Sequence, residues 1–263
     1  MKRLLFTCCF ILANLALSES SANKPAIRSI KNNAFQEGEV LTFKLHYGII
    51  NAGIGELRVM DNPVKIAGKE CLHVVATGRS ISSFDWFYKV RDRYETYIDK
   101  QAMVPWLFKR DIYEGGYTFK DTYRFAHESN QVHVDKEVFS IPNYVQDIVS
   151  SFYFARTLDF RYARKGDTFD VPMFLDKETH NFRFRFMGRE TLKIGPGTFK
   201  VMVFMPVVMT GRVFKNEEDL MVYVSDDDNK IPLQIKANIL IGSVKMTLTE
   251  YSGLKNPVSS KIK

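Results

Sequence analysis

Strict alternation of apolar and polar side chains is the feature that most constrains the fold of this chain. Leu41, Phe43 and Leu45 fall on one side of an extended segment, and Thr42 and Lys44 fall on the other. Period two of this kind is typical of a β-strand with one buried face. The same pattern predicts further strands at 55–60, 70–78, 89–98, 105–114, 117–125, 181–189, 198–206, 219–225, 232–240 and 244–251. The chain should therefore be mainly β.

Turn-forming residues separate these segments, which indicates that neighbouring strands run antiparallel. Gly115-Gly116, Gly195-Pro196-Gly197 and the acidic run from Asp226 to Asn229 each stand between two predicted strands. Gly242-Ser243 suits a tight two-residue hairpin, because glycine at the first turn position tolerates a positive φ. The acidic run lacks the glycine and distal glutamate of the known calcium loop, so we interpret it as a turn.

One segment has helical spacing instead. Val145, Ile148, Val149, Phe152 and Ala155 follow Asn143 at intervals of three and four residues. This spacing predicts an amphipathic helix over 144–158, started by Asn143, with Ile148, Val149 and Phe152 buried against sheet.

Residues on the two sides of this helix recur at a nearly constant spacing. The matched pairs include Gly38 with Gly166, 128 positions apart, and Pro105 with Pro232 and Gly115 with Gly242, each 127 apart. The spacing predicts repeats at 35–127 and 163–254, although β-meanders also resemble one another through turn composition alone. We therefore expect two similar antiparallel, curved β-sheet units, half-barrel or sandwich-like, with one amphipathic helix between them. A cleft between the units would be the natural place for a ligand.

The N-terminus resembles an export signal. Lys2 and Arg3 precede an apolar run from Leu4 to Leu17, and small residues follow, which predicts a signal peptide at 1–22 cut after Ala22 or after Ser18. Most of the apolar run follows Cys8 and Cys9, so neither cysteine suits lipid attachment. We expect a flexible tail at 23–34, a β-rich domain at 35–254 and a polar tail at 255–263.

Cysteine content and charge agree with an exported protein that meets envelope surfaces. Removal of the signal leaves Cys71 as the single cysteine, so no internal disulfide can form. The net charge of +7 falls by one when Lys2, Arg3 and Glu19 are removed. In this compartment a basic protein meets anionic lipid headgroups and acidic glycans, whereas we expect no nucleic-acid partner.

Residue patterns of known catalytic centres are missing from the sequence. The chain has no G-x-S-x-G, and its five histidines show no metal-ligand spacing. No metal, cofactor or catalytic residue is therefore predicted. Glu95, Glu114 and Asp121 could act as acid or base on a glycan, but we interpret them as solvent-facing strand positions.

A dense group of aromatic and basic residues is the candidate ligand site. Aromatic residues at this density either fill a core or line a groove for an acyl chain or sugar ring. The candidate binding residues are Trp86, Tyr88, Arg93, Trp106, Arg110, Tyr113 and Tyr117.

Several short motifs resemble one bacterial family over nearly the whole mature chain. They are Gly38-Glu39 with Leu41-Thr42-Phe43, Tyr47-Gly48, Ala52-Gly53, Asp92 to Asp99 with Pro105, Glu114-Gly115 with Tyr117, Arg156-Thr157-Leu158, Gly197-Thr198-Phe199, Asp228 to Pro232, and Gly242-Ser243-Val244. In this order they resemble the exported proteins of domain of unknown function 3108, with Lys230 where arginine is expected. The resemblance implies a secreted or periplasmic β-rich domain of Gram-negative bacteria, and it implies no catalytic residue, substrate or cofactor.

Together these observations favour a non-enzymatic periplasmic protein that binds or helps to assemble an amphipathic envelope component, which could be a lipid, a lipoprotein or a glycan. The alternative is a hydrolase that acts on a cell-envelope glycan. Peripheral contact with a membrane surface fits either function, and the sequence leaves the oligomeric state open.

Overall fold

The computed structural model describes residues 27–207, 219–239 and 242–262, and the predicted signal peptide with its cleavage site lies outside them. The described elements are β1 (Val40–Tyr47), β2 (Ile50–Val59), β3 (Val64–Ile66), β4 (Lys69–Ser80), α1 (Ser82–Asp85), β5 (Arg91–Asp99), β6 (Pro105–Glu114), β7 (Tyr117–Ala126), β8 (Gln131–Val134), β9 (Glu137–Ser140), α2 (Ile148–Ala155), β10 (Thr168–Leu175), β11 (Glu178–Ile194), β12 (Gly197–Pro206), β13 (Leu220–Ser225), β14 (Pro232–Asn238) and β15 (Ser243–Ser252).

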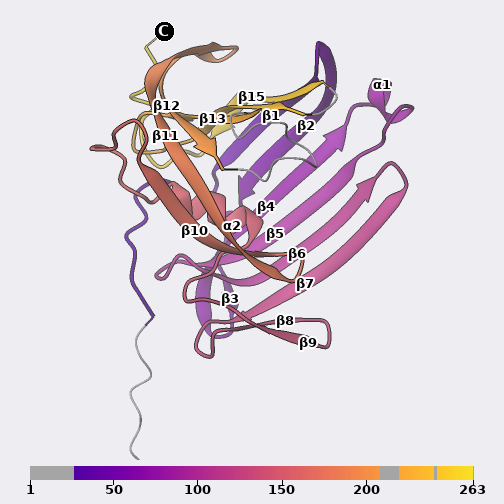
Figure 1. The fold of residues 1–263 in the computed structure, drawn as a ribbon, viewed down its shortest axis with the longest axis vertical. Coiled ribbons are helices and arrows are strands. Elements are labelled where there is room, and N and C mark those ends of the chain that lie inside the picture. The colour runs from indigo at the N-terminus through magenta and orange to yellow at the C-terminus, as the bar shows by residue number, and fades with distance from the viewer. Residues whose placement is uncertain (1–26, 208–218, 240–241, 263) are drawn as a thin grey trace, which may run out of the picture.

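All of the strands belong to one large antiparallel sheet that is not closed into a barrel. Its strand order is β10-β11-β12-β13-β14-β15-β1-β2-β4-β5-β6-β7-β8-β9, and β3 pairs with β4 alone. The sheet curves around α2, as Figure 1 shows. The mainly β, antiparallel and curved architecture predicted from the sequence is confirmed. Pairing of β1 with β15 joins the two predicted units edge to edge.

Every strand predicted by alternation is present, and four strands were missed. Three of these, β3, β8 and β9, have only three or four residues each, which is too short for a pattern to emerge. In the fourth, β10, Pro172 interrupts the alternation. Proline is tolerated there because β10 is the end strand of the sheet order, where a missing N–H costs few ladder bonds.

The two predicted glycine hairpins differ in where the glycine lies relative to the paired residues. Gly115 and Gly116 both have positive φ, and the paired residues on either side are Glu114 and Tyr117, so this loop has the two residues predicted. In the second hairpin Asn238 pairs with Ser243. The Ile239 N–H also donates to the Gly242 carbonyl at 3.1 Å, and Ser243 already belongs to β15, so the two-residue loop predicted at Gly242-Ser243 was wrong.

Residues matched by the repeat spacing occupy similar places. Gly38 and Gly166 both have positive φ, and their N–H groups donate to the carbonyl oxygens of Val59 at 3.0 Å and Phe186 at 2.8 Å. Pro105 and Pro232 each begin a strand, β6 and β14. The strands β10 to β15 are neighbours in sequence order, as are β1, β2, β4, β5, β6 and β7. A duplication of the chain stays a prediction.

The helix is shorter than predicted. Residues 144–147 are not helical, because the Gln146 backbone pairs with β10: its N–H donates to the Pro172 carbonyl and its C=O accepts from Phe174, both at 2.8 Å. Asp147 rather than Asn143 begins the helix, and its Oδ1 accepts from the N–H groups of Val149 and Ser150. The helix ends at Ala155.

The residues expected to be loose tails pack on the sheet instead. The Ile30 N–H donates to the Gln101 carbonyl, and Ala34 is buried. At the other end, the Lys200 backbone N–H donates to the Ser260 carbonyl, and the Ile262 N–H donates to the Thr198 carbonyl, both at 2.8 Å. Both segments therefore pack against the domain, since polar composition did not prevent them from forming backbone hydrogen bonds with it.

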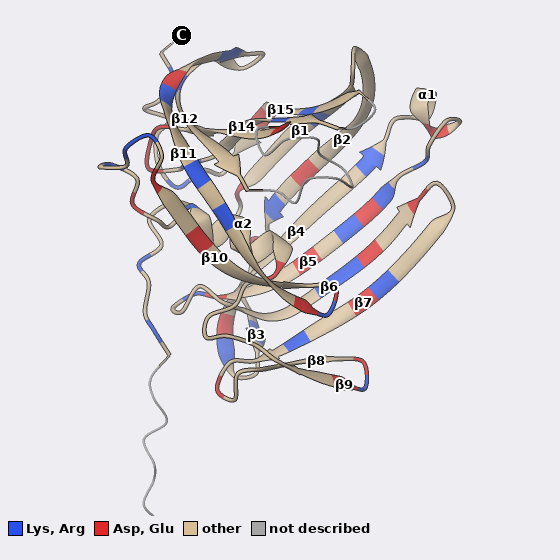
Figure 2. Cartoon of the chain, viewed as in Figure 1, with Lys and Arg blue, Asp and Glu red and all other residues tan. Residues whose placement is uncertain are grey.

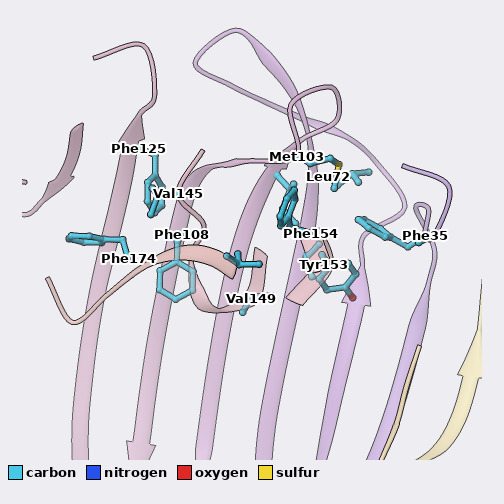
Figure 3. Close-up of a cluster of buried hydrophobic side chains, with 14 of the residues drawn as sticks. Phe35, Leu72, Met103, Phe108, Phe125, Val145, Val149, Tyr153, Phe154 and Phe174 are labelled. Atoms are coloured by element: carbon cyan, nitrogen blue, oxygen red, sulfur yellow. The ribbon is translucent and has the colours of Figure 1, made fainter. Parts of the chain in front are cut away.

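The main core lies between the curved sheet and α2. Figure 3 shows Val149, Tyr153 and Phe154 beside Phe35, Leu72 and Phe108. A second cluster includes Leu41 and Phe43 of β1, Phe199 and Val201 of β12, and Leu248 of β15. Period two along each strand and the stripe on α2 thus bury the side chains that stabilise the fold.

Candidate functional site

Helix α2 has one face in the core and a second face left partly open. Val149, Tyr153 and Phe154 are buried, whereas Ile148 is 40% exposed and Phe152 is half-buried. Burial of Ile148 and Phe152, expected from their spacing, is thus incomplete. The open face points at the strands of the second half of the sheet, and an apolar groove separates the two.

The groove has a volume of about 280 Å³ and is walled by α2 on one side and by β10 to β14 on the other. Phe204, Val222 and Ile235 are paired across β12, β13 and β14, so they share the sheet face that lines it. Phe182 and Phe184 of β11 extend the same wall. Nearly all of the groove lining is apolar carbon, so displacement of water from the groove by an apolar ligand would be favourable.

A cation stands at one end of this groove. Lys230 lines the apolar groove and also a neighbouring polar cavity of about 410 Å³, which Lys31, Asp159 and Arg161 line as well. The Lys230 ammonium forms no hydrogen bond or ion pair with any residue that the structure describes. Burial lowers the pKa of Lys230, and the nearby Asp228 carboxylate opposes that shift. An anionic group at this end of the groove would therefore relieve an unpaired, partly desolvated charge.

Arg156, directly after α2, fixes the end of the groove. Its guanidinium is buried and contacts both oxygens of Glu39, with Nη1 at 2.6 Å from Oε1 and Nη2 at 2.8 Å from Oε2. Nε donates to the Asn229 carbonyl at 3.0 Å, and Nη2 donates to that of Ala34. The turn before Lys230 is thereby held against the helix. The Asp226 to Asn229 run forms a turn, as predicted, and Asp227 Oδ1 accepts from the Asn229 N–H.

The residues predicted as a ligand site are not gathered in one place. Trp86, Tyr88 and Tyr117 are exposed at loops along one rim of the sheet. Trp106 is buried with Cys71 and donates to Asp99 at 2.9 Å. Tyr113 and Arg93 lie on the face away from α2, and Arg93 is ion-paired with Glu95. Arg110 lies on the opposite, inner face, ion-paired with Asp121 and Asp176.

The carboxylates considered for glycan hydrolysis lie on two sides of the sheet. Glu95 pairs with Lys109 on the outer face and contacts His73 at 2.8 Å. Glu114 and Asp121 lie on the inner face with Arg110, since Arg110 pairs with Asp121 and Glu114 is four residues from Arg110 on the same strand. Glu95 therefore cannot face a common cleft with the other two.

One inner-face carboxyl has a perturbed ionisation. Burial raises the pKa of Asp92 to about 6, and the neighbouring Glu114 carboxyl contributes in the same direction. A nearby like charge favours the protonated carboxyl, in the same sense as burial does. Among the described residues no group of three His, Cys, Asp or Glu side chains could hold a metal ion. No helix of the described residues is long and apolar enough to cross a membrane.

Sequence reasoning missed the groove, although some of its residues were noticed. The strand at 181–189 and the apolar stripe of the helix were predicted, but nothing in their spacing says that these two apolar surfaces fail to close on each other. The sequence offers only a weak indication of Lys230 as a site residue, which is that it follows a turn of three consecutive aspartates and one asparagine.

Comparison with known proteins identifies the family and the fold. A structure of a β-barrel-like protein of domain of unknown function DUF1849 from Brucella abortus matches with a TM-score of 0.52 and 8% identity, covering 87% of this chain and 99% of that one. A protein described as a proposed lipoprotein from Parabacteroides distasonis matches with a TM-score of 0.36 and 13% identity over 86% of this chain and 99% of that one. A third match, a protein proposed to be exported, with a YmcC-like fold, comes from Bacteroides fragilis; its TM-score is 0.34, with 11% identity over the same shares.

The first of these matches is a likeness in fold alone, since its sequence identity is low. No curated protein matches the sequence. The model of the family described as protein of unknown function (DUF3108) matches residues 42–249, which is most of the chain. This chain, an open antiparallel β-sheet curved around α2, therefore belongs to the DUF3108 family.

Proposed function

We propose that this protein is an exported, non-enzymatic binding protein of the cell envelope that holds the acyl part of an amphipathic lipid beside α2. The observation that supports this function is the apolar groove between Ile148 and Phe152 of the helix and the strands β10 to β14. Apolar walls with Lys230 at one end, beside an Arg156 that is already paired with Glu39, suit a ligand that has a hydrocarbon tail and an acidic head.

The size of the groove supports part of an acyl chain rather than a whole lipid. Its volume of about 280 Å³ lies near the lower end of ordinary ligand pockets. Burial of about eight methylene groups would gain about 6 kcal/mol, at about 0.8 kcal/mol for each. Pairing of the head group with Lys230 would add to this, because the ammonium is already partly desolvated.

The export signal expected at residues 1–22 and the net charge of +7 support an envelope location. A glycan is a weaker candidate for this groove, since sugar hydroxyls need polar partners that its apolar walls do not offer. A lipoprotein would be held through its acyl chains in the same way as a free lipid.

Displacement of a fluorescent fatty acid from the purified protein tests the proposal. Ile148→Asp places a carboxylate in the groove, and at the first position of α2 the negative charge suits the helix N-terminus, so the fold should persist. We expect this variant to lose at least about tenfold in affinity, equivalent to about 1.4 kcal/mol.

Val138→Asp is the matched control, since Val138 is an exposed apolar residue on β9, outside the groove. Equal affinity of both variants, or no binding by the wild-type protein, would refute the groove as a lipid site. Mass spectrometry of protein purified from the periplasm under native conditions would identify a co-purifying lipid directly.

A further inference from the structure

Six large apolar side chains are exposed together along one rim of the sheet. Ten such side chains are exposed among the described residues, and the four others are scattered. We call the group of six the aromatic rim; its members are Ile49, Ile50, Trp86, Phe87, Tyr88 and Tyr117. Trp86 is 83% exposed and Ile49 is 99% exposed. Exposed apolar groups at this density mark an interaction surface.

Three loops that are distant in sequence form this rim. Figure 1 shows the β1–β2 hairpin, α1 and the β6–β7 hairpin following one another along one edge of the curved sheet. The Ile81 N–H donates to the Ala52 carbonyl at 3.1 Å, which ties the α1 loop to β2. The Gly115 N–H donates to the Lys89 carbonyl at 2.8 Å, which ties the third loop to the second.

Close packing fixes the relative places of these loops. The Tyr88 ring covers Gly115, where any Cβ would overlap the ring. Phe84 and Phe87 contact each other with ring centroids 5.5 Å apart, and both line a shallow cavity of about 320 Å³ with Leu45 and Tyr47. The rim is thus a built surface, in which inner aromatic side chains support the exposed ones.

A row of cations borders the rim on the outer face of the sheet. Cross-strand pairing places Lys236 beside Lys245 and Lys245 beside His46, and it places Arg79 beside Arg91. Like charges directly opposite each other destabilise a sheet, so such rows are costly for folding alone. Figure 2 shows a basic residue at the end of β4 towards this edge, and basic residues alternating with acidic ones along β5.

Most of these cations lack an acidic partner. Five exposed basic side chains form what we call the cationic belt: those of Lys44, Arg79, Lys89, Lys236 and Lys245. None of them forms an ion pair with a carboxylate of the described residues. Arg91, in contrast, is paired with Asp85 at 2.6 Å.

From this juxtaposition we propose that the aromatic rim and the cationic belt dock the protein on the surface of an anionic lipid bilayer. Trp, Tyr and Phe prefer the headgroup region of a membrane, where an apolar ring and a polar edge are both satisfied. Lysine and arginine beside the rim would meet anionic headgroups within a Debye length. A protein partner would be expected to offer matched carboxylates at fixed places, whereas a cationic row spread over β14, β15, β1 and β4 suits a continuous anionic surface.

Tryptophan fluorescence with vesicles provides the direct test. The chain has two tryptophans, and Trp106 is buried, so a change on vesicle binding reports on Trp86. With vesicles of phosphatidylethanolamine and phosphatidylglycerol we expect a blue shift and quenching by brominated acyl chains, both weakened by salt. With phosphatidylcholine alone we expect much weaker binding.

Co-sedimentation of variants with the same vesicles tests the two parts of the surface. Ile49→Glu should weaken binding at least about tenfold, and each of Lys44→Gln and Lys245→Gln about fivefold. The matched controls are Tyr162→Glu, at another exposed large apolar residue away from the rim, and Lys136→Gln in the β8–β9 turn. Both should bind as the wild type does.

Several outcomes would overturn the proposal. These are no binding of the folded wild-type protein to either vesicle, equal binding to both vesicles, and equal loss in Tyr162→Glu. A protein dimer that Ile49→Glu abolishes would assign the rim to protein contacts instead. The result is separable from lipid binding in the groove, because Ile148→Asp should retain vesicle binding and Ile49→Glu should retain fatty-acid binding.

Discussion

Replacement of Arg156 by leucine should strongly destabilise the fold, because it leaves a buried carboxylate without its partner. The Arg156 and Glu39 side chains are 2% and 0% exposed, and two charge-assisted hydrogen bonds of 2.6 and 2.8 Å join them. Loss of one member of such a pair costs about 3–5 kcal/mol. The carbonyls of Asn229 and Ala34 also lose a donor, which places the cost towards the upper end.

This loss is a large share of the free energy of unfolding of an ordinary domain, which is about 5–15 kcal/mol. In a domain of this size each kcal/mol lowers the melting temperature by about 2–4 °C, so we expect a decrease of roughly 10 °C or more. Urea unfolding followed by circular dichroism measures the free energy directly. Replacement of both Arg156 and Glu39 by leucine should recover much of it, since an apolar pair leaves no buried charge.

Arg183→Leu is the matched control for the first variant. Arg183 contacts Asp170 at 2.7 Å, but the side chains are 49% and 42% exposed. Exposed pairs of this kind contribute at most about 1 kcal/mol. The reasoning would be refuted if Arg156→Leu and Arg183→Leu destabilised the protein equally, or if the double variant were no more stable than Arg156→Leu.

Three further predictions concern single ionisable groups. Burial raises the pKa of Asp147 to about 6, so its stabilising contribution is complete below about pH 4, its unfolded pKa, and is lost as the pH rises through 6. Asparagine at this position can still cap α2. Between pH 4 and 7 the free energy of unfolding of Asp147→Asn, measured by urea titration, should therefore rise relative to that of the wild type by up to about 3 kcal/mol. A difference between the two proteins that does not change with pH would contradict this. Burial raises the pKa of the Cys71 thiol to about 12. Iodoacetamide at pH 8 should therefore modify Cys71 in urea but not in the native protein, as measured by the masses of its peptides. Rapid labelling of the native protein would contradict the burial of Cys71. Lys230→Gln should weaken binding of a fatty acid about tenfold and leave binding of the matching fatty alcohol unchanged. Because burial lowers the pKa of Lys230, the wild-type preference for the acid should weaken as the pH rises towards 10. Equal loss for both ligands would exclude a charge contact.

Local patterns in the sequence determined much of the architecture. Alternation in Leu41, Phe43 and Leu45 located a strand without reference to any other part of the chain, because side chains of an extended segment point to opposite faces. Gly115-Gly116 located a two-residue hairpin, since both positions need a positive φ that glycine adopts without steric cost. Mainly β structure, antiparallel pairing and the family followed from such features.

The tertiary structure decided how those elements meet, because contacts between distant residues are not encoded in local spacing. Trp86 and Trp106 belong to equally aromatic segments, yet one is exposed on a rim and the other is buried beside Cys71. The helix lost its predicted first turn because the Gln146 backbone finds partners on β10. The groove exists because the apolar stripe of α2 and the apolar face of β11 to β14 do not close completely on each other. Periodicity predicts that two apolar surfaces will pack, but the space left between them depends on how the whole sheet curves.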